Sequence, residues 1–308
     1  MTRLRPATGL CVALVALVPA VAQAQPLPPP AIRDGLATPS LPPVASPTIP
    51  PPDAPSGPQQ VTLSAFLSGD SKPIRSGIVW RIFLDRGSEA APEFKEKLTT
   101  PTPTTTLPPG SYIVHAAYGL AATTRRITVA SSPIDERLAI EAGALQLSGA
   151  IGDIPIPPER VMFSIYQPLP NDSEGRLVAA NVKAGELVRL PEGTYHVVST
   201  YGESNAIMRT DLRVDRGKIT DATLNHRAAT VTLKLVAAAG GEAFAGTAFS
   251  VLTPGGDVIR EAIGAFPTVV LAEGEYTVIA RHNGKVYTRE FRVESGLNSD
   301  IEVLVDSG

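Results

Sequence analysis

The residues able to carry chemistry are few and widely scattered along this chain. Four histidines are present, and no two of them stand at metal-ligand spacing with a carboxylate. Two of them alternate with a tyrosine in the same expected strand and therefore point away from it. A zinc or iron site is not expected at these histidines, which are His115, His196, His226 and His282.

Nucleophilic and acid–base catalysis are not expected either. The chain has neither a Gly-x-Ser-x-Gly elbow nor a Ser-x-x-Lys pair, and its one cysteine is Cys11. Residues 171–175 resemble a calcium loop in composition, but they lack its alternating acidic ligands and closing glutamate, which favours a solvated hairpin turn. We therefore expect a protein that is not an enzyme and that needs no cofactor. Scattered carboxylates form no evident catalytic pair, as with Glu136, Glu141, Asp215 and Asp221.

One sequence motif, the phrase Leu-x-x-Gly-x-Tyr-x-Val, occurs three times and indicates the repeated secondary structure of the chain. Its copies span residues 107–114, 190–197 and 271–278. They lie about 80 residues apart, so the chain contains a tandem repeat of about 80 residues. The phrase consists of turn and strand residues, which points to architecture and not to a reaction. Its repeated positions are Leu107, Gly110, Tyr112, Leu190, Gly193, Tyr195, Leu271, Gly274 and Tyr276.

The N-terminus has the pattern of an export signal. Basic residues precede an apolar run at 10–18, and Ala22-Gln23-Ala24 supplies small residues where a signal peptidase cleaves. A retained membrane anchor is the alternative, but the run is shorter than the ~20 residues needed to cross a bilayer. A lipoprotein is disfavoured because Cys11 begins the apolar run and does not close it. The mature chain then has no cysteine and no transmembrane segment, and each repeat depends on its own hydrophobic core.

Residues 25–59 form a proline-rich segment with few large apolar side chains. Such a composition cannot bury enough surface to offset the entropy of ordering, so we expect a disordered linker with polyproline-II bias. It can act as a spacer, or as a ligand for a partner domain that binds proline-rich segments.

Each repeat reads as a set of short strands. An alternating strand opens it, for instance at 61–67, and a second strand carries one large ring, which is Trp80, Phe163 or Phe249. No stretch has helical periodicity. The expected fold class is all-β, with three tandem antiparallel β-sandwich domains of immunoglobulin-like or transthyretin-like type. The expected parts are a signal peptide at 1–24, a proline-rich disordered linker at 25–59, and sandwich repeats at 60–143, 144–228 and 229–308.

The phrase also suggests how each sandwich turns a corner. A leucine ends one strand, a glycine able to take positive φ makes the turn, and a tyrosine begins the next strand. This resembles the tyrosine corner of immunoglobulin-like sandwiches, whose hydroxyl bonds to nearby backbone. The repeats resemble bacterial extracytoplasmic sandwich repeats of the transthyretin-like group, which includes carboxypeptidase-regulatory-like and PEGA-type domains. That resemblance implies attachment, spacing or recognition in the cell envelope.

These observations predict a non-catalytic exported envelope protein, periplasmic or secreted, that serves as a structural spacer or an interaction scaffold. The alternative is a carbohydrate- or peptide-binding accessory module, for which Phe94, Tyr166, Phe244 and Tyr287 are the candidate rings. The partner is an envelope protein or glycan of unknown identity. Mixed charge and a net charge of −3 leave no basic face for nucleic acid, and the oligomeric state stays open. An unguarded sheet edge is a possible contact, at Thr268, Val269 and Val270.

Overall fold

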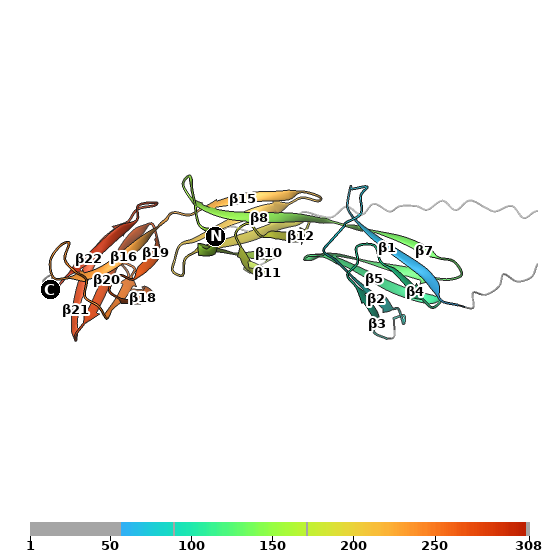
Figure 1. The fold of residues 1–308 in the computed structure, drawn as a ribbon, viewed down its shortest axis with the longest axis horizontal. Helices are drawn as coiled ribbons and strands as arrows, with labels where there is room; N and C mark the ends of the chain where they lie inside the picture. The colour runs from blue at the N-terminus through green and yellow to red at the C-terminus, as the bar shows by residue number, and fades with distance from the viewer. Residues whose placement is uncertain (1–56, 89, 171, 306–308) are drawn as a thin grey trace, which may run out of the picture. The chain divides into compact units, whose positions relative to one another are not determined.

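The computed structural model describes residues 57–88, 90–170 and 172–305, all of which belong to one compact unit, Pro52–Gly308. The expected signal peptide and nearly all of the expected proline-rich linker lie outside the described residues. Within the described part the chain forms three β-sandwiches and contains no α-helix, as the sequence predicts (Figure 1). We call them sandwiches 1, 2 and 3 in chain order.

Sandwich 1 is built from strands β1 (Gln59–Leu67), β2 (Ile78–Leu84), β3 (Glu93–Leu98), β4 (Thr104–Leu107), β5 (Gly110–Tyr118), β6 (Ala121–Val129) and β7 (Ile134–Ile140). A small sheet has the order β4-β1-β7, and a large sheet has the order β3-β2-β5-β6. Alternation places Val61, Leu63 and Ala65 of β1 on the inner face, where all three are fully buried. The ring of Trp80 faces them from β2, so the core lies between the two sheets.

Sandwich 2 repeats this arrangement with a short hairpin added. Its small sheet has the order β12-β8-β15 with β9 paired to β8, and its large sheet has the order β11-β10-β13-β14. Phe163 takes the place of Trp80 in the core. The elements are β8 (Ala142–Ile151), β9 (Ile154–Pro155), the 3-10 turn η1 (Pro158–Arg160), β10 (Val161–Leu169), β11 (Asp172–Lys183), β12 (Leu187–Pro191), β13 (Gly193–Tyr201), β14 (Ile207–Val214) and β15 (Ile219–Asn225).

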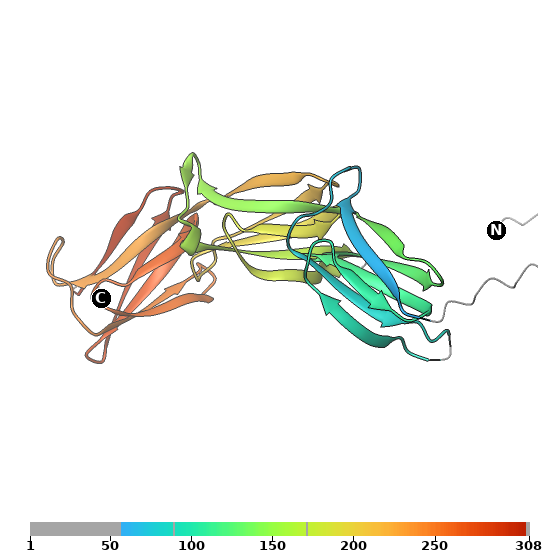
Figure 2. The ribbon, with the colours of Figure 1, turned by 45° about the vertical axis from the view of Figure 1, so that its right-hand side comes forward.

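Sandwich 3 has the same pair of sheets, in the orders β19-β16-β22 and β18-β17-β20-β21. Phe249 supplies its central ring. The two layers of each sandwich are visible from a second direction in Figure 2. The strands are β16 (Ala228–Val236), β17 (Thr247–Leu252), β18 (Val258–Gly264), β19 (Thr268–Ala272), β20 (Gly274–His282), β21 (Lys285–Val293) and β22 (Ser299–Leu304).

One parallel pair stands within each otherwise antiparallel sandwich, a detail that the sequence does not indicate. The first strand of each sandwich pairs in parallel with its last, as β1 with β7, β8 with β15 and β16 with β22. Because both strands run toward the same end, the chain enters each sandwich at one end and leaves it at the other. β7 ends at Ile140 and β8 begins at Ala142, while His226 and Arg227 alone separate β15 from β16. The strands thus begin slightly before the expected boundaries at 144 and 229.

Candidate functional site: the tyrosine corners and the joints

The repeated phrase builds the same corner in all three sandwiches. The hydroxyl of Tyr112 donates to the carbonyl oxygen of Pro108 at 2.9 Å, and Tyr195 donates to Pro191 at 3.0 Å. Tyr276 donates to the carbonyl of Ala272 at 2.8 Å. Each bond connects the end of an edge strand of the small sheet to the first residues of a strand in the large sheet. Burial raises the pKa of Tyr112 and of Tyr195, which keeps both hydroxyls protonated as donors.

The glycines of the phrase do not have the left-handed backbone that the sequence suggests. Gly110 and Gly274 have φ of 158°, close to fully extended, and Gly193 has no positive φ. The reason is that each glycine is the first residue of a strand and not part of the turn itself. A Cβ placed on Gly193 would meet the Tyr195 ring at 3.7 Å, an ordinary contact. Gly193 therefore does not make the turn with a positive φ.

The first joint connects sandwich 1 to the edge strand β12 of sandwich 2. The amide of Leu120, in the turn between β5 and β6, donates to the carbonyl oxygen of Arg189 at 3.0 Å. The guanidinium of Arg189 lies over the ring of Tyr118, 4.5 Å from its centroid. Gly119 has φ of 64°, and a Cβ added there would lie 2.6 Å from the Cβ of Arg189. The turn can therefore approach β12 this closely only because Gly119 has no side chain.

The second joint connects sandwich 2 to the edge strand β19 of sandwich 3. Gly202 has φ of 69°, and a Cβ added there would lie 2.7 Å from the Cβ of Val270. Asn205 accepts a hydrogen bond from the amide of Ala272 at 3.0 Å and donates to the hydroxyl of Tyr276 at 2.8 Å. Because Tyr276 also forms the corner of sandwich 3, this joint and that corner share one hydrogen-bond network.

The two joints are equivalent by position in the repeat. Gly119 and Gly202 each follow the tyrosine that ends the strand begun by the phrase, and Arg189 and Val270 each precede the leucine of the next phrase. In both cases a glycine turn of one sandwich packs on the small-sheet edge of the following one. The sequence indicates Tyr-Gly as a repeated feature, but it does not show which residues these turns contact.

The second joint covers part of the predicted sheet edge at residues 268–270. β19 does stand at the edge of its sheet, next to β16. Its side chains are nevertheless covered, since Val269 is 4% exposed and Val270 is 6% exposed. Val269 packs in the core of sandwich 3, whereas Val270 packs with the core residues of sandwich 2. Val269 and Val270 therefore offer no exposed side chain at this edge, and of the three residues only Thr268 is exposed, while the contact at this edge stays a prediction.

A cleft of about 600 Å³ lies beside the second joint, and His226 in the connection between β15 and β16 forms part of its wall. The ring of His226 is buried, its Nε2 lies 2.7 Å from the Ser199 hydroxyl, and it meets the Tyr201 ring edge-on. Burial lowers the pKa of His226, so the ring is held neutral. Arg227 and Glu273 form a bidentate pair at 2.8 and 3.0 Å at the exposed rim.

The remaining candidates from the sequence are not brought together. In sandwich 2, Nδ1 of His196 lies 2.9 Å from a carboxylate oxygen of Asp211. In sandwich 3, Nδ1 of His282 lies 3.3 Å from the Thr247 hydroxyl. Among the described residues no group of three or more His, Cys, Asp or Glu side chains could hold a metal ion. The described part also contains no helix long and apolar enough to cross a membrane.

The candidate rings do not form a platform. Phe94 is 55% exposed and Tyr287 is 8% exposed. Tyr166 and Phe244 are half-buried, the latter packed against His282 at 5.2 Å between centroids. Phe94 is thus the one ring of these four that is free to meet a large ligand.

Comparisons with known proteins find a family model that matches the last repeat alone. Residues 230–305, nearly all of sandwich 3, match the model of the Rhizobiales growth-associated tandem repeat domain. A search of curated proteins found no match. The transthyretin-like and PEGA-type resemblance stays a resemblance, because no comparison tests it.

Several solved structures resemble parts of the chain. The Bacillus anthracis TIE protein is 16% identical with a TM-score of 0.26, over 82% of this chain and 51% of that protein. A streptococcal ancillary pilin is 13% identical with a TM-score of 0.29, over 80% of this chain and 98% of that one. The minor pilin GBS52 of Streptococcus agalactiae is 15% identical with a TM-score of 0.27, over 55% of this chain and 95% of that one. This chain thus matches about half the length of the first protein, and similarity at this level carries no argument about function.

Proposed function

We propose that this chain is a non-catalytic exported protein of the cell envelope, in which tandem sandwiches form a structural spacer or an interaction scaffold. The observation that carries the proposal is the repeated joint. Two glycine turns, at Gly119 and Gly202, pack on two equivalent strand edges and leave almost no free linker between sandwiches. A protein whose sandwiches only needed to bind ligands independently would not need such close packing at both connections.

The corners support the same proposal. Tyr112, Tyr195 and Tyr276 are buried and their hydroxyls are engaged with backbone carbonyls, so we assign them a structural role. The export part of the proposal rests on the N-terminal sequence, with its basic start, apolar run and Ala-Gln-Ala cleavage pattern. Periplasmic and secreted locations both satisfy this pattern.

Flexible insertions test the proposal in the native cell. A short Gly-Ser linker inserted between Ile140 and Glu141, or between His226 and Arg227, releases a joint without changing any core residue. The same linker between Gly255 and Gly256, in an exposed turn of sandwich 3, is the matched control. We expect the joint insertions to fail to complement a deletion strain and the control insertion to succeed.

Full complementation by both joint insertions, with the protein present at normal abundance, would contradict a spacer or scaffold that depends on fixed joints. That outcome would favour the alternative, a binding module whose sandwiches act independently. Failure of the control insertion as well would show that the phenotype reports abundance or folding, and the measurement would then be repeated at matched protein levels.

A further inference from the structure

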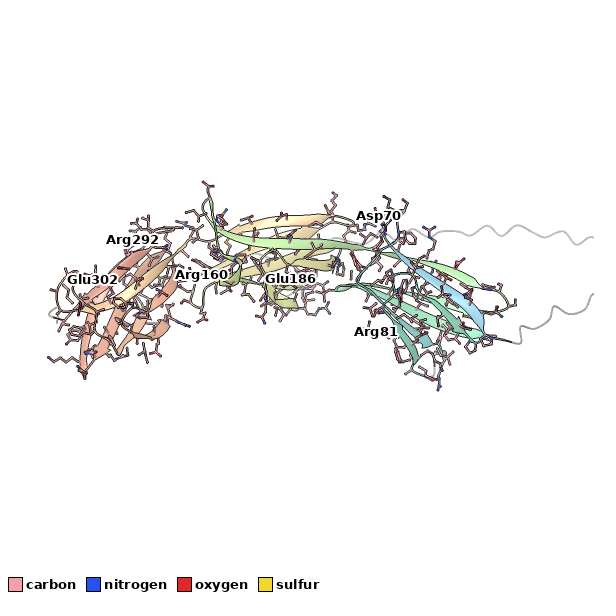
Figure 3. All side chains as sticks on the ribbon, in the orientation of Figure 1. Asp70, Arg81, Arg160, Glu186, Arg292 and Glu302 are labelled. Atoms are coloured by element: carbon pink, nitrogen blue, oxygen red, sulfur yellow. The ribbon has the colours of Figure 1, made fainter. Side chains whose placement is uncertain are left out.

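A row of three basic side chains crosses the outer face of the large sheet of sandwich 1. Arg81 on β2 is directly opposite Lys97 on β3 and directly opposite His115 on β5. Arg81 lies between Trp80 and Ile82, which are fully buried, so it points away from the core (Figure 3). Neighbouring strands are ~4.7–4.9 Å apart, and like charges placed opposite each other destabilise a sheet.

The row has no counter-charge in the described part of the chain. Neither an ion pair nor a hydrogen bond is found there for the side chains of Arg81 and Lys97, and Nδ1 of His115 is buried without a hydrogen-bond partner. Burial and the nearby Arg81 charge lower the pKa of His115, so this ring is a neutral member of the row near pH 7.

Several acidic residues of the same sandwich already have partners outside the row. Glu93 pairs with Arg86 and with Lys95, the latter at 2.8 Å. Asp85 pairs with Arg126 at 2.5 Å. These carboxylates therefore do not neutralise Arg81 and Lys97.

The other sandwiches show that the fold does not require these charges. The repeats can be aligned on their central core rings and on the tyrosines of the repeated phrase. In this alignment Arg81 corresponds to Ser164 and Ser250. His115 corresponds in the same way to Val198 and Ile279. In sandwich 3 the place of Lys97, opposite Ser250, is held by Glu261, so no like-charge pair stands there. The fold therefore does not require the opposition of Arg81 and Lys97, which calls for an explanation outside folding.

An aromatic surface adjoins the row. Phe83 lies two residues after Arg81 on the same face, and its ring meets that of Phe94 edge-on, with 5.7 Å between centroids. Phe94 is 55% exposed. The face therefore offers a ring for stacking beside two permanent positive charges.

We propose that this face of sandwich 1, formed by Arg81, Lys97, His115 and Phe94, binds an acidic polysaccharide. The carboxylate or other anionic groups of the chain would pair with Arg81 and Lys97, and the apolar face of one sugar ring would rest on Phe94.

Other anionic partners fit this face less well. β2 and β5 have a strand on both sides, so a peptide could add to this sheet next to the proposed face only at the free edge of β3, where it would lie beside Lys97 and not beside Arg81. Side chains on one side of an extended peptide recur at ~6.6–6.8 Å. This repeat does not match the ~4.7–4.9 Å between the neighbouring strands that carry Arg81 and Lys97. Bilayers are held by clusters of ~4–8 basic residues or by lipid anchors, and this row has two permanent charges.

Calorimetric titration of the mature chain tests the proposal. The probe is polygalacturonate, with neutral dextran as the uncharged polymer and phosphatidylglycerol vesicles as the lipid arm. We expect polygalacturonate to bind, and the Arg81→Gln/Lys97→Gln variant to bind at least about tenfold more weakly, because two charge-assisted contacts are lost. The charge-matched control, Lys183→Gln/Arg209→Gln on the large sheet of sandwich 2, should bind like the unmodified chain.

The folded state is monitored in the same experiment. Since the double substitution removes like-charge opposition, its thermal midpoint should equal or exceed that of the unmodified chain. If it fails to fold, the exposed Phe94→Ala variant replaces it and should also weaken binding. No binding of polygalacturonate, equal binding of dextran, binding of the vesicles alone, or unchanged affinity in the folded variants would each overturn the proposal.

Discussion

Substitution of Gly119 by alanine should weaken the first joint by a calculable amount. Gly119 has φ of 64°, so any side chain there costs about 1–2 kcal/mol of backbone strain. The new Cβ would also lie 2.6 Å from the Cβ of Arg189, against an optimum of ~3.5–4.0 Å between carbon atoms. Overlap of this kind ordinarily costs about 1–3 kcal/mol.

The joint can avoid that overlap only by opening, which limits the extra cost. Opening sacrifices the bond from the Leu120 amide to the Arg189 carbonyl, with a net contribution of about 0.5–1.5 kcal/mol, and the contact of Arg189 with the Tyr118 ring, about 0.5–1 kcal/mol. Gly119→Ala should therefore destabilise sandwich 1 by about 1–2.5 kcal/mol more than backbone strain alone.

Denaturant unfolding followed by Trp80 fluorescence measures this difference, because Trp80 is the only tryptophan and is buried in sandwich 1. Gly87→Ala is the matched control, since Gly87 belongs to the same sandwich, has φ of 80° and has no atom within 4 Å of an added Cβ. Amide exchange at Leu120 reports opening of the joint directly.

A second substitution separates steric overlap from other causes. Arg189→Gly removes the Cβ that the methyl group of the new alanine would strike, so Gly119→Ala should cost less in that background than in the unmodified chain, although the carbonyl oxygen of residue 189 at 3.1 Å remains. Equal costs of Gly119→Ala and Gly87→Ala in the unmodified chain, with unchanged exchange at Leu120, would refute the close packing at this joint.

Three further predictions concern the corner, the buried histidine and the covered edge. Tyr195→Phe removes only the bond to the Pro191 carbonyl and should cost about 1 kcal/mol in urea unfolding, whereas Tyr166→Phe on the same sandwich should change little; equal effects would contradict the corner assignment. Because burial lowers the pKa of His226 in the folded state, unfolded chains bind more protons than folded ones below pH ~6.5. The free energy of unfolding should therefore be highest above pH ~6.5 and fall as the pH drops below it, and a melting midpoint that stays flat from pH 8 to 5 would contradict this. Val270→Lys should increase amide exchange at Ala272 and in the turn at Gly202 while leaving the core of sandwich 3 folded, and unchanged exchange there would mean that Val270 does not pack in the second joint.

The strands and their inner faces could be predicted because each sandwich is built from local alternation. Leu63, Trp80 and Phe163 occupy the core positions that a period of two assigns to them. The hydroxyl bonds of the phrase tyrosines also follow a local pattern, since each reaches the residue four positions earlier. Features of this kind need no knowledge of how distant segments meet.

The remaining features depend on distant segments and could not be read from local pattern. Gly119 contacts Arg189, and Arg81 stands between Lys97 and His115 on strands that only folding brings together. The parallel pairing of first and last strands is likewise a property of topology and not of composition. The extended φ at Gly110 shows a further limit, because a glycine in a turn phrase can begin a strand without using its conformational freedom.

Residual dipolar couplings across residues 59–304 test the central claim most directly. If the two glycine joints hold the sandwiches in fixed contact, couplings from all three sandwiches should give alignment tensors of equal magnitude and rhombicity. Gly119→Ala should loosen the first joint, so the magnitude of the tensor from sandwich 1 should then differ from that of sandwiches 2 and 3. Three tensors of clearly different magnitude in the unmodified chain would show that the sandwiches move independently, and would contradict the proposed role of the joints.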